Sequence, residues 1–63
     1  MQTFNVTGMT CAHCERAVTR AIQARDAQAR VRVDLQASVV QVEGNLSAAA
    51  IREAIEEEGY QVR

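Results

Sequence analysis

The chain has 63 residues, of which 48% are hydrophobic and 24% are charged, a composition typical of a globular domain and not of a disordered chain. A net charge of -1 and only two aromatic residues, Phe4 and Tyr60, provide neither a basic surface nor a stacking platform for nucleic acid. So short a chain has little room for a deep cleft with several catalytic groups, so we expect one domain over residues 1–63 and not a complex enzyme.

The first half of the sequence predicts a strand followed by a helix. Residues 2–7 alternate between apolar and polar, which predicts a half-buried strand, and Gly8 ends the pattern. A loop over residues 9–13 follows. From about Cys14 the spacing becomes helical, and this helix fades near residues 25–26. Its apolar stripe consists of Cys14, Ala17, Val18, Ala21 and Ile22.

The second half predicts a hairpin, a second helix and a short last strand. Residues 30–35 alternate and lead through a turn into a second alternating stretch that ends at Gly44. Ser47 is a suitable N-cap for the second helix, and Gly59 is suited to the position just past its C-terminus. Residues 60–63 complete the chain as a strand. The apolar stripe of the second helix consists of Ala50, Ile51, Ala54 and Ile55.

The order β-α-β-β-α-β predicts the ferredoxin-like α+β fold, in which an antiparallel four-stranded sheet carries both helices on one face. In this topology the first strand and the second helix end at the same end of the sheet. The turn predicted at residues 36–38 belongs to that end as well. We therefore expect Gly59 and Tyr60 to lie near the loop that precedes the first helix.

The two cysteines, Cys11 and Cys14, are three positions apart at the junction of the first strand and the first helix. The positive end of a helix dipole favours a thiolate, and we expect Cys14, in the first turn, to benefit more than Cys11. Two soft thiolates suit Cu(I), which accepts two ligands. Hg(II) behaves in the same way, and Zn(II) is a weaker candidate because structural zinc takes four ligands.

The spacing of the cysteine pair is also compatible with three alternative roles. Half of a zinc site would need a second Cys/His pair, which the chain lacks. A thiol–disulfide oxidoreductase of the thioredoxin type would be longer and would contain a proline, and this chain has none. Two inert core cysteines would be unusual in a loop beside a glycine.

The segment Gly8-Met9-Thr10-Cys11-Ala12-His13-Cys14 resembles the GMTCxxC loop of the heavy-metal-associated domain family, and most of all that of bacterial CopZ-type copper chaperones. The resemblance implies a ferredoxin-like fold, with Cu(I) held by Cys11 and Cys14. It also implies transfer of copper to the metal-binding domain of a copper-exporting P-type ATPase, with no catalysed reaction. The alternative is an excised N-terminal domain of a copper or mercury transporter.

Three residues around the pair are candidates for supporting roles. Met9 is expected to fill the core beneath the loop, the alternative being a third sulfur ligand. His13 is expected to be exposed on a monomer, although its imidazole could ligate metal or bridge a copper-linked dimer. Tyr60 is expected to close over the metal end and to hydrogen-bond a cysteine sulfur, as the tyrosine frequent here in bacterial chaperones of the family implies. The alternative for Tyr60 is a core aromatic with its hydroxyl in water.

Arg16 and Arg20 share the exposed face of the first helix beside the cysteines, and residues 56–58 end the second helix with glutamates. These charges form either a solvated surface or a docking surface for a partner, with the arginines attracting an acidic domain. No segment has the apolar length of a membrane span, and no secretory signal precedes the first strand. The sequence therefore favours a cytoplasmic protein.

Overall fold

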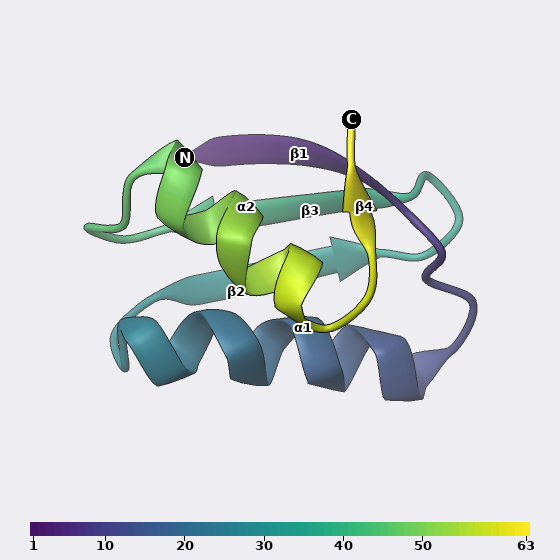
Figure 1. Cartoon of the computed structure of the whole chain (residues 1–63), viewed down its shortest axis with the longest axis horizontal. Coiled ribbons are helices and arrows are strands. Elements are labelled where there is room, and N and C mark those ends of the chain that lie inside the picture. The colour runs from purple at the N-terminus through teal and green to yellow at the C-terminus, as the bar shows by residue number, and fades with distance from the viewer.

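The computed structural model describes residues 1–63, and in it a four-stranded sheet carries both helices on one face (Figure 1). The elements are β1 (Gln2–Thr7), α1 (Ala12–Arg25), β2 (Arg30–Asp34), β3 (Val39–Glu43), α2 (Ala48–Glu57) and β4 (Gln61–Val62). The predicted ferredoxin-like α+β fold is confirmed.

The strands lie in the order β2-β3-β1-β4, and every neighbouring pair is antiparallel. The registers place Val40 opposite both Phe4 and Val33, and Val62 opposite Val6, so the apolar side chains of all four strands face the helices. The buried core comprises Phe4, Val6, Met9, Val18, Ile22, Ala29, Val40, Val42, Ile51, Ala54 and Ile55. Burial of these side chains is the main force that holds the helices on the sheet.

The predicted meeting of three loops at one end of the sheet is observed. The backbone N–H of Val6, near the end of β1, donates to the carbonyl of Ser38 in the β2–β3 turn at 2.8 Å. From the other side, the Tyr60 ring between α2 and β4 packs against Gly8. The segment that carries the cysteines therefore leaves the sheet between the β2–β3 turn and the α2–β4 connection.

Two predicted boundaries are wrong. The helix α1 begins at Ala12 and not near Cys14, because the carbonyl of Cys11 already accepts from the N–H groups of Cys14 at 3.0 Å and Glu15 at 3.3 Å. The last strand covers Gln61–Val62 and not residues 60–63, although the N–H of Arg63 still donates to the carbonyl of Asn5 at 2.8 Å. His13 therefore lies in the first helical turn and not in a loop.

The opposite end of the sheet is closed by Asp26, to which the sequence patterns assigned no role. One carboxylate oxygen accepts from the N–H of Gln28 at 3.0 Å, and the other accepts from the N–H of Asn45 at 3.1 Å. A Cβ at Gly44 would lie 2.8 Å from this second oxygen, so a larger residue there would displace the Asp26 carboxylate. Asp26 thus ties the end of α1 to the β3–α2 connection.

Candidate metal centre

The cysteine loop begins at a sharp turn out of β1. Gly8 has φ +97°, a conformation that L side chains rarely adopt. A Cβ at this position would also lie 3.3 Å from Cδ1 of Tyr60. Gly8 therefore serves the site twice: it redirects the chain, and it leaves space for the aromatic ring against the backbone.

Cys11 and Cys14 are brought together by the start of α1. Cys11 is the N-cap residue with extended backbone, and its side chain makes no capping hydrogen bond. Cys14 lies in the first turn, which directs its side chain back toward Cys11. The two Sγ atoms are 3.8 Å apart, and both cysteines are free thiols. Cys11 is exposed, whereas Cys14 is half-buried against the core.

The surroundings of Cys14 favour its thiolate. A hydrogen bond from the Tyr60 hydroxyl is the largest cause that lowers the pKa of Cys14 to about 6, and hydrogen bonding from the backbone at Thr10 acts in the same direction. The same interaction with Cys14 raises the pKa of Tyr60 to about 12. The lowered pKa of Cys14 therefore depends chiefly on a side chain 46 positions away in the sequence.

Met9 and His13, which flank Cys11 in the sequence, differ in burial. The Met9 side chain is only 6% exposed and belongs to the core cluster, as expected. His13 is exposed on the first turn of α1. No group of three or more His, Cys, Asp or Glu side chains is arranged to hold a metal ion. The soft donor atoms that the structure brings together are the two cysteine sulfurs.

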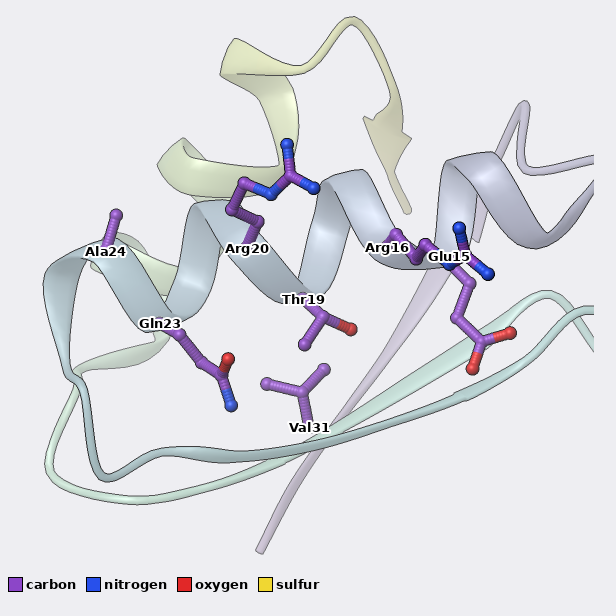
Figure 2. Close-up of a pocket in the computed structure, with 7 residues that line it drawn as sticks. All are labelled: Glu15, Arg16, Thr19, Arg20, Gln23, Ala24 and Val31. Carbon is purple, nitrogen blue, oxygen red and sulfur yellow. The ribbon is translucent and has the colours of Figure 1, made fainter.

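Arg16 and Arg20 are exposed on α1 and line an open hollow of about 660 Å³ between this helix and β2. Figure 2 shows Thr19 and Gln23 facing Val31 of β2, while Arg16 and Arg20 project from another side of the helix. Neither arginine takes part in an ion pair; the ion pairs of the structure join Arg25 to Glu53 and Glu57. Both guanidinium groups are therefore without a charged partner within the chain.

The packing of Gly8 against Tyr60 is the part of the site that sequence reasoning missed. The sequence indicated Gly8 only as the residue that ends a strand. Tyr60 was expected to close over the metal end and to hydrogen-bond a cysteine sulfur, but not to pack on Gly8. The topology could have predicted this contact, because Gly8 follows β1 and Tyr60 precedes β4 at the same end of the sheet. The contact distance itself follows from the register of β1 with β4, in which Thr7 faces Gln61.

The model of the heavy-metal-associated domain matches residues 3–61. The chain belongs to the heavy-metal-associated domain family. A relative from Staphylococcus haemolyticus, the copper chaperone CopZ, is 38% identical over an alignment 63 positions long. The alignment covers 95% of this chain and 93% of that protein. The chain is also 40% identical to a segment of copper-transporting ATPase 2 from Rhizobium meliloti, over 95% of this chain but 8% of the ATPase.

Among solved structures of the family, the copper chaperone Atx1 from Synechocystis superposes with a TM-score of 0.97. The two sequences are 36% identical, and the superposition covers 100% of both chains. The heavy-metal-associated domain thus accounts for the whole fold of this protein. None of the helices is both long and apolar enough to cross a membrane.

Proposed function

We propose that this chain is a carrier of Cu(I), which binds one ion between Cys11 and Cys14 and passes it to a partner protein without catalysing a reaction. The observation that carries the proposal is the pair of sulfur atoms 3.8 Å apart at the start of α1. Thiolate sulfur is the ligand that Cu(I) prefers. Copper is the cargo named for the staphylococcal and cyanobacterial relatives, which supports this choice over Hg(II) and Zn(II).

The geometry of the pair suits a single ion. Bonds of about 2.3 Å from one ion place two thiolate sulfurs at most about 4.6 Å apart, when the three atoms are in line. The sulfurs are 3.8 Å apart, so linear coordination needs them to separate by less than an ångström. Cys11 is exposed and has no hydrogen bond that fixes its side chain apart from the contact with Cys14, so it can make this movement.

The charge of the site also suits a monovalent soft ion. Two thiolates and one Cu(I) leave a net charge of about minus one. Hydrogen bonding by Tyr60, the largest cause of the lowered pKa of Cys14, would disperse part of this charge. The proposed location is the cytoplasm, because a reducing compartment would keep both thiols available for copper.

The direct test is an anaerobic titration of the reduced protein with Cu(I) against a competing chelator, with Zn(II) and Hg(II) run in parallel. We expect one tightly bound Cu(I) per chain, and loss of competitive binding when either cysteine is replaced, as in Cys11→Ser or Cys14→Ser. Met9 and His13 substitutions should keep the stoichiometry. Competitive Cu(I) binding by the double cysteine variant would place the site elsewhere, and sizing at excess copper would show whether His13 supports a dimer.

The partner that we propose is the metal-binding domain of a copper-transporting P-type ATPase. The similarity of the chain to a segment of the rhizobial ATPase supports it, because carrier and acceptor would then present equivalent pairs of cysteines. Cys11 is the exposed ligand and Cys14 the anchored one, so an incoming thiolate reaches the ion most readily at Cys11. The free guanidinium groups of Arg16 and Arg20 would steer an acidic acceptor to this face.

Transfer kinetics test the partner. Reversal of both charges in Arg16→Glu/Arg20→Glu should slow transfer to an ATPase domain at low salt and leave copper affinity unchanged. The slowing should shrink at high salt, because the Debye length falls to roughly 8 Å at physiological ionic strength. The matched control is Arg52→Glu/Arg63→Glu, which changes the net charge equally at exposed arginines away from the exposed face of α1. Equal rates for the two double variants would contradict steering by α1.

A second candidate is that the chain acts as the metal-binding domain of a copper transporter. The 40% identity to part of the rhizobial ATPase favours it specifically. The two candidates share the site and differ in what the domain is attached to. Sequencing the complete gene, together with its neighbours, distinguishes a separate carrier from a domain of a transporter.

A further inference from the structure

The strand β2 is the longest strand that lies at an edge of the sheet over its whole length. At the opposite edge, β4 has just two residues and pairs with β1 only at Val6 and Thr7, so that edge is divided between two strands. In contrast, β2 extends over Arg30–Asp34 and pairs with β3 on one side only. Every second residue of an edge strand directs its N–H and C=O groups outward, where another strand can pair with them.

Both sides of this edge are hollowed. The hollow on the helix side, of about 660 Å³, is lined by Arg16, Thr19, Arg20 and Val31 among others (Figure 2). A second hollow of about 250 Å³, on the face away from the helices, is lined by Arg30, Val31 and Arg32. Val31 contributes to both, so the two hollows flank the same stretch of β2. A strand added beside β2 would direct its side chains alternately into one hollow and the other.

Each hollow carries an excess of positive charge. The helix side has Arg16 and Arg20 against Glu15, and the outer side has Arg30 and Arg32 against Glu43. None of these charged side chains forms an ion pair within the chain; Arg25 forms the only ion pairs. The cations therefore lie beside the edge strand β2, and they lie on both of its faces.

We propose that the β2 edge binds an extended acidic segment of a partner protein, which adds to the sheet as a fifth strand. Its carboxylates would reach Arg30 and Arg32 on the outer face, and the segment would run along the hollow that Arg16 and Arg20 line on the helix side. The proposal concerns the metal-free fold and does not depend on copper binding. The backbone pairing supplies the alignment of the segment, and the four guanidinium groups supply the preference for acidic sequence.

Charge also favours an acidic segment of a partner protein over a second copy of this chain as the strand bound beside β2. An antiparallel pair of β2 strands centred on Arg32 would set Arg32 against its own copy. It would also bring the Arg16 and Arg20 side chains of both copies to the same layer. Arginines on an edge strand protect against such self-pairing. The same side chains attract a carboxylate-rich strand, which is the occupant of opposite charge.

The test uses the reduced, metal-free protein labelled with ¹⁵N and an acetylated, amidated heptapeptide of alternating Glu and Val. We expect amide shifts confined to β2, the facing side of α1 and their connection, and slowed exchange of the outward N–H groups of β2. A peptide of identical sequence, N-methylated at alternate residues, keeps the charge but cannot pair as a strand. It should lose binding by roughly tenfold or more, since several backbone hydrogen bonds are removed.

Charge reversal gives the second arm. Arg30→Glu/Arg32→Glu should weaken binding of the unmodified peptide by roughly tenfold, and Arg52→Glu/Arg63→Glu, with the same net charge, should change it by less than about threefold. Three results would overturn the proposal: no binding by the wild-type protein, equal binding of the N-methylated peptide, or equal loss in both double variants. Concentration-dependent shifts along β2 without peptide would show that the occupant is a second copy. The peptide comparison needs only wild-type protein, so it decides the matter even if a variant fails to fold.

Discussion

The two ends of the sheet are constructed differently. At the end where α1 finishes, polar side chains link separate connections of the chain through hydrogen bonds. Asp26 accepts from the backbone N–H groups of Gln28 and Asn45, and the Gln2 side chain donates to the carbonyl of Leu46 at 2.9 Å. At the end where α1 begins, no side chain caps the helix, and the two sulfurs contact mainly each other and Tyr60.

This difference separates stability from metal binding. The far end uses its polar groups within the fold, so substitutions there should change the free energy of unfolding and leave the site unchanged. At the end where α1 begins, the cysteine thiols and the Tyr60 hydroxyl do not fasten one part of the fold to another. Substitutions of these groups should therefore change metal binding and thiol pKa values and leave the fold intact. Met9 is the instructive exception, because it belongs to the metal loop by sequence and to the core by position.

The largest effect is expected from Met9→Ala. Removing a side chain that is 6% exposed leaves a cavity beneath the loop, and such truncations lower the free energy of unfolding by about 2–5 kcal/mol. Urea denaturation measures this loss, and the Cu(I) titration should still give one ion per chain. A thioether ligand seen by X-ray absorption, or a loss of copper without a loss of stability, would assign Met9 to the site instead.

A smaller effect is expected from Asp26→Ala, which removes acceptors for the N–H groups of Gln28 and Asn45. Hydrogen bonds to a charged group contribute about 1.5–3 kcal/mol, and exposure of these two favours the lower part of that range. The matched control is Asp34→Ala, at the metal end, which removes a single bond to the N–H of Ala37 at 3.1 Å. Copper affinity should be unaffected in both, and a larger loss in Asp34→Ala would reverse the proposed contrast between the ends.

Of these substitutions, Tyr60→Phe should change the fold least, but it should clearly change the pKa of Cys14. Loss of the hydroxyl removes the largest cause of the lowered pKa of Cys14, which should rise from about 6 toward the ordinary value of 9.0. Thiolate absorbance as a function of pH, measured in the Cys11→Ser background so that one thiol titrates, reports this shift. Cu(I) exchange should change as well, because the bound thiolate loses a hydrogen-bond donor.

The sign of the accompanying stability change follows from the lowered pKa. The contribution of the Cys14 thiolate is fully present above the unfolded value of 9.0 and is lost as the pH falls through about 6. The wild-type protein should therefore gain stability over Tyr60→Phe as the pH rises across this window. At acidic pH the two unfolding curves should converge. Parallel curves at all pH values would show that Tyr60 does not act on the Cys14 thiol.

Patterns of short range predicted most of the fold. Alternation in residues 2–7 and helical spacing after Cys14 located β1 and α1, and the antiparallel topology then placed Tyr60 beside the loop. The start of α1 was missed because Cys11 is not among the usual N-cap residues, and Ala12 and His13 add nothing to the apolar stripe. The predicted strand and helix order needed only local information.

Contacts between polar residues that are far apart in the sequence could not be predicted from it. Nothing near Asp26 indicates that its carboxylate reaches Asn45, because the contact exists only after α1 and β3 have packed. The same holds for Arg25, which binds Glu53 at 3.2 Å and Glu57 at 2.8 Å and so offsets part of the repulsion in the acidic end of α2. The sequence predicted a hydrogen bond from Tyr60 to a cysteine sulfur but not which cysteine, and the effect on the pKa of Cys14 required the positions of both side chains.

Under the proposed function, an ion bound at the uncapped start of α1 would help to hold that helix together. Cys11 occupies the N-cap position and Cys14 the third helical position, the same two positions that a serine and a glutamate link in a capping box. An ion bound to both sulfurs would join them covalently across the first turn. Fraying of that turn and release of the ion would then be a single event, so amide exchange at Ala12 and His13 would report how long the cargo is held.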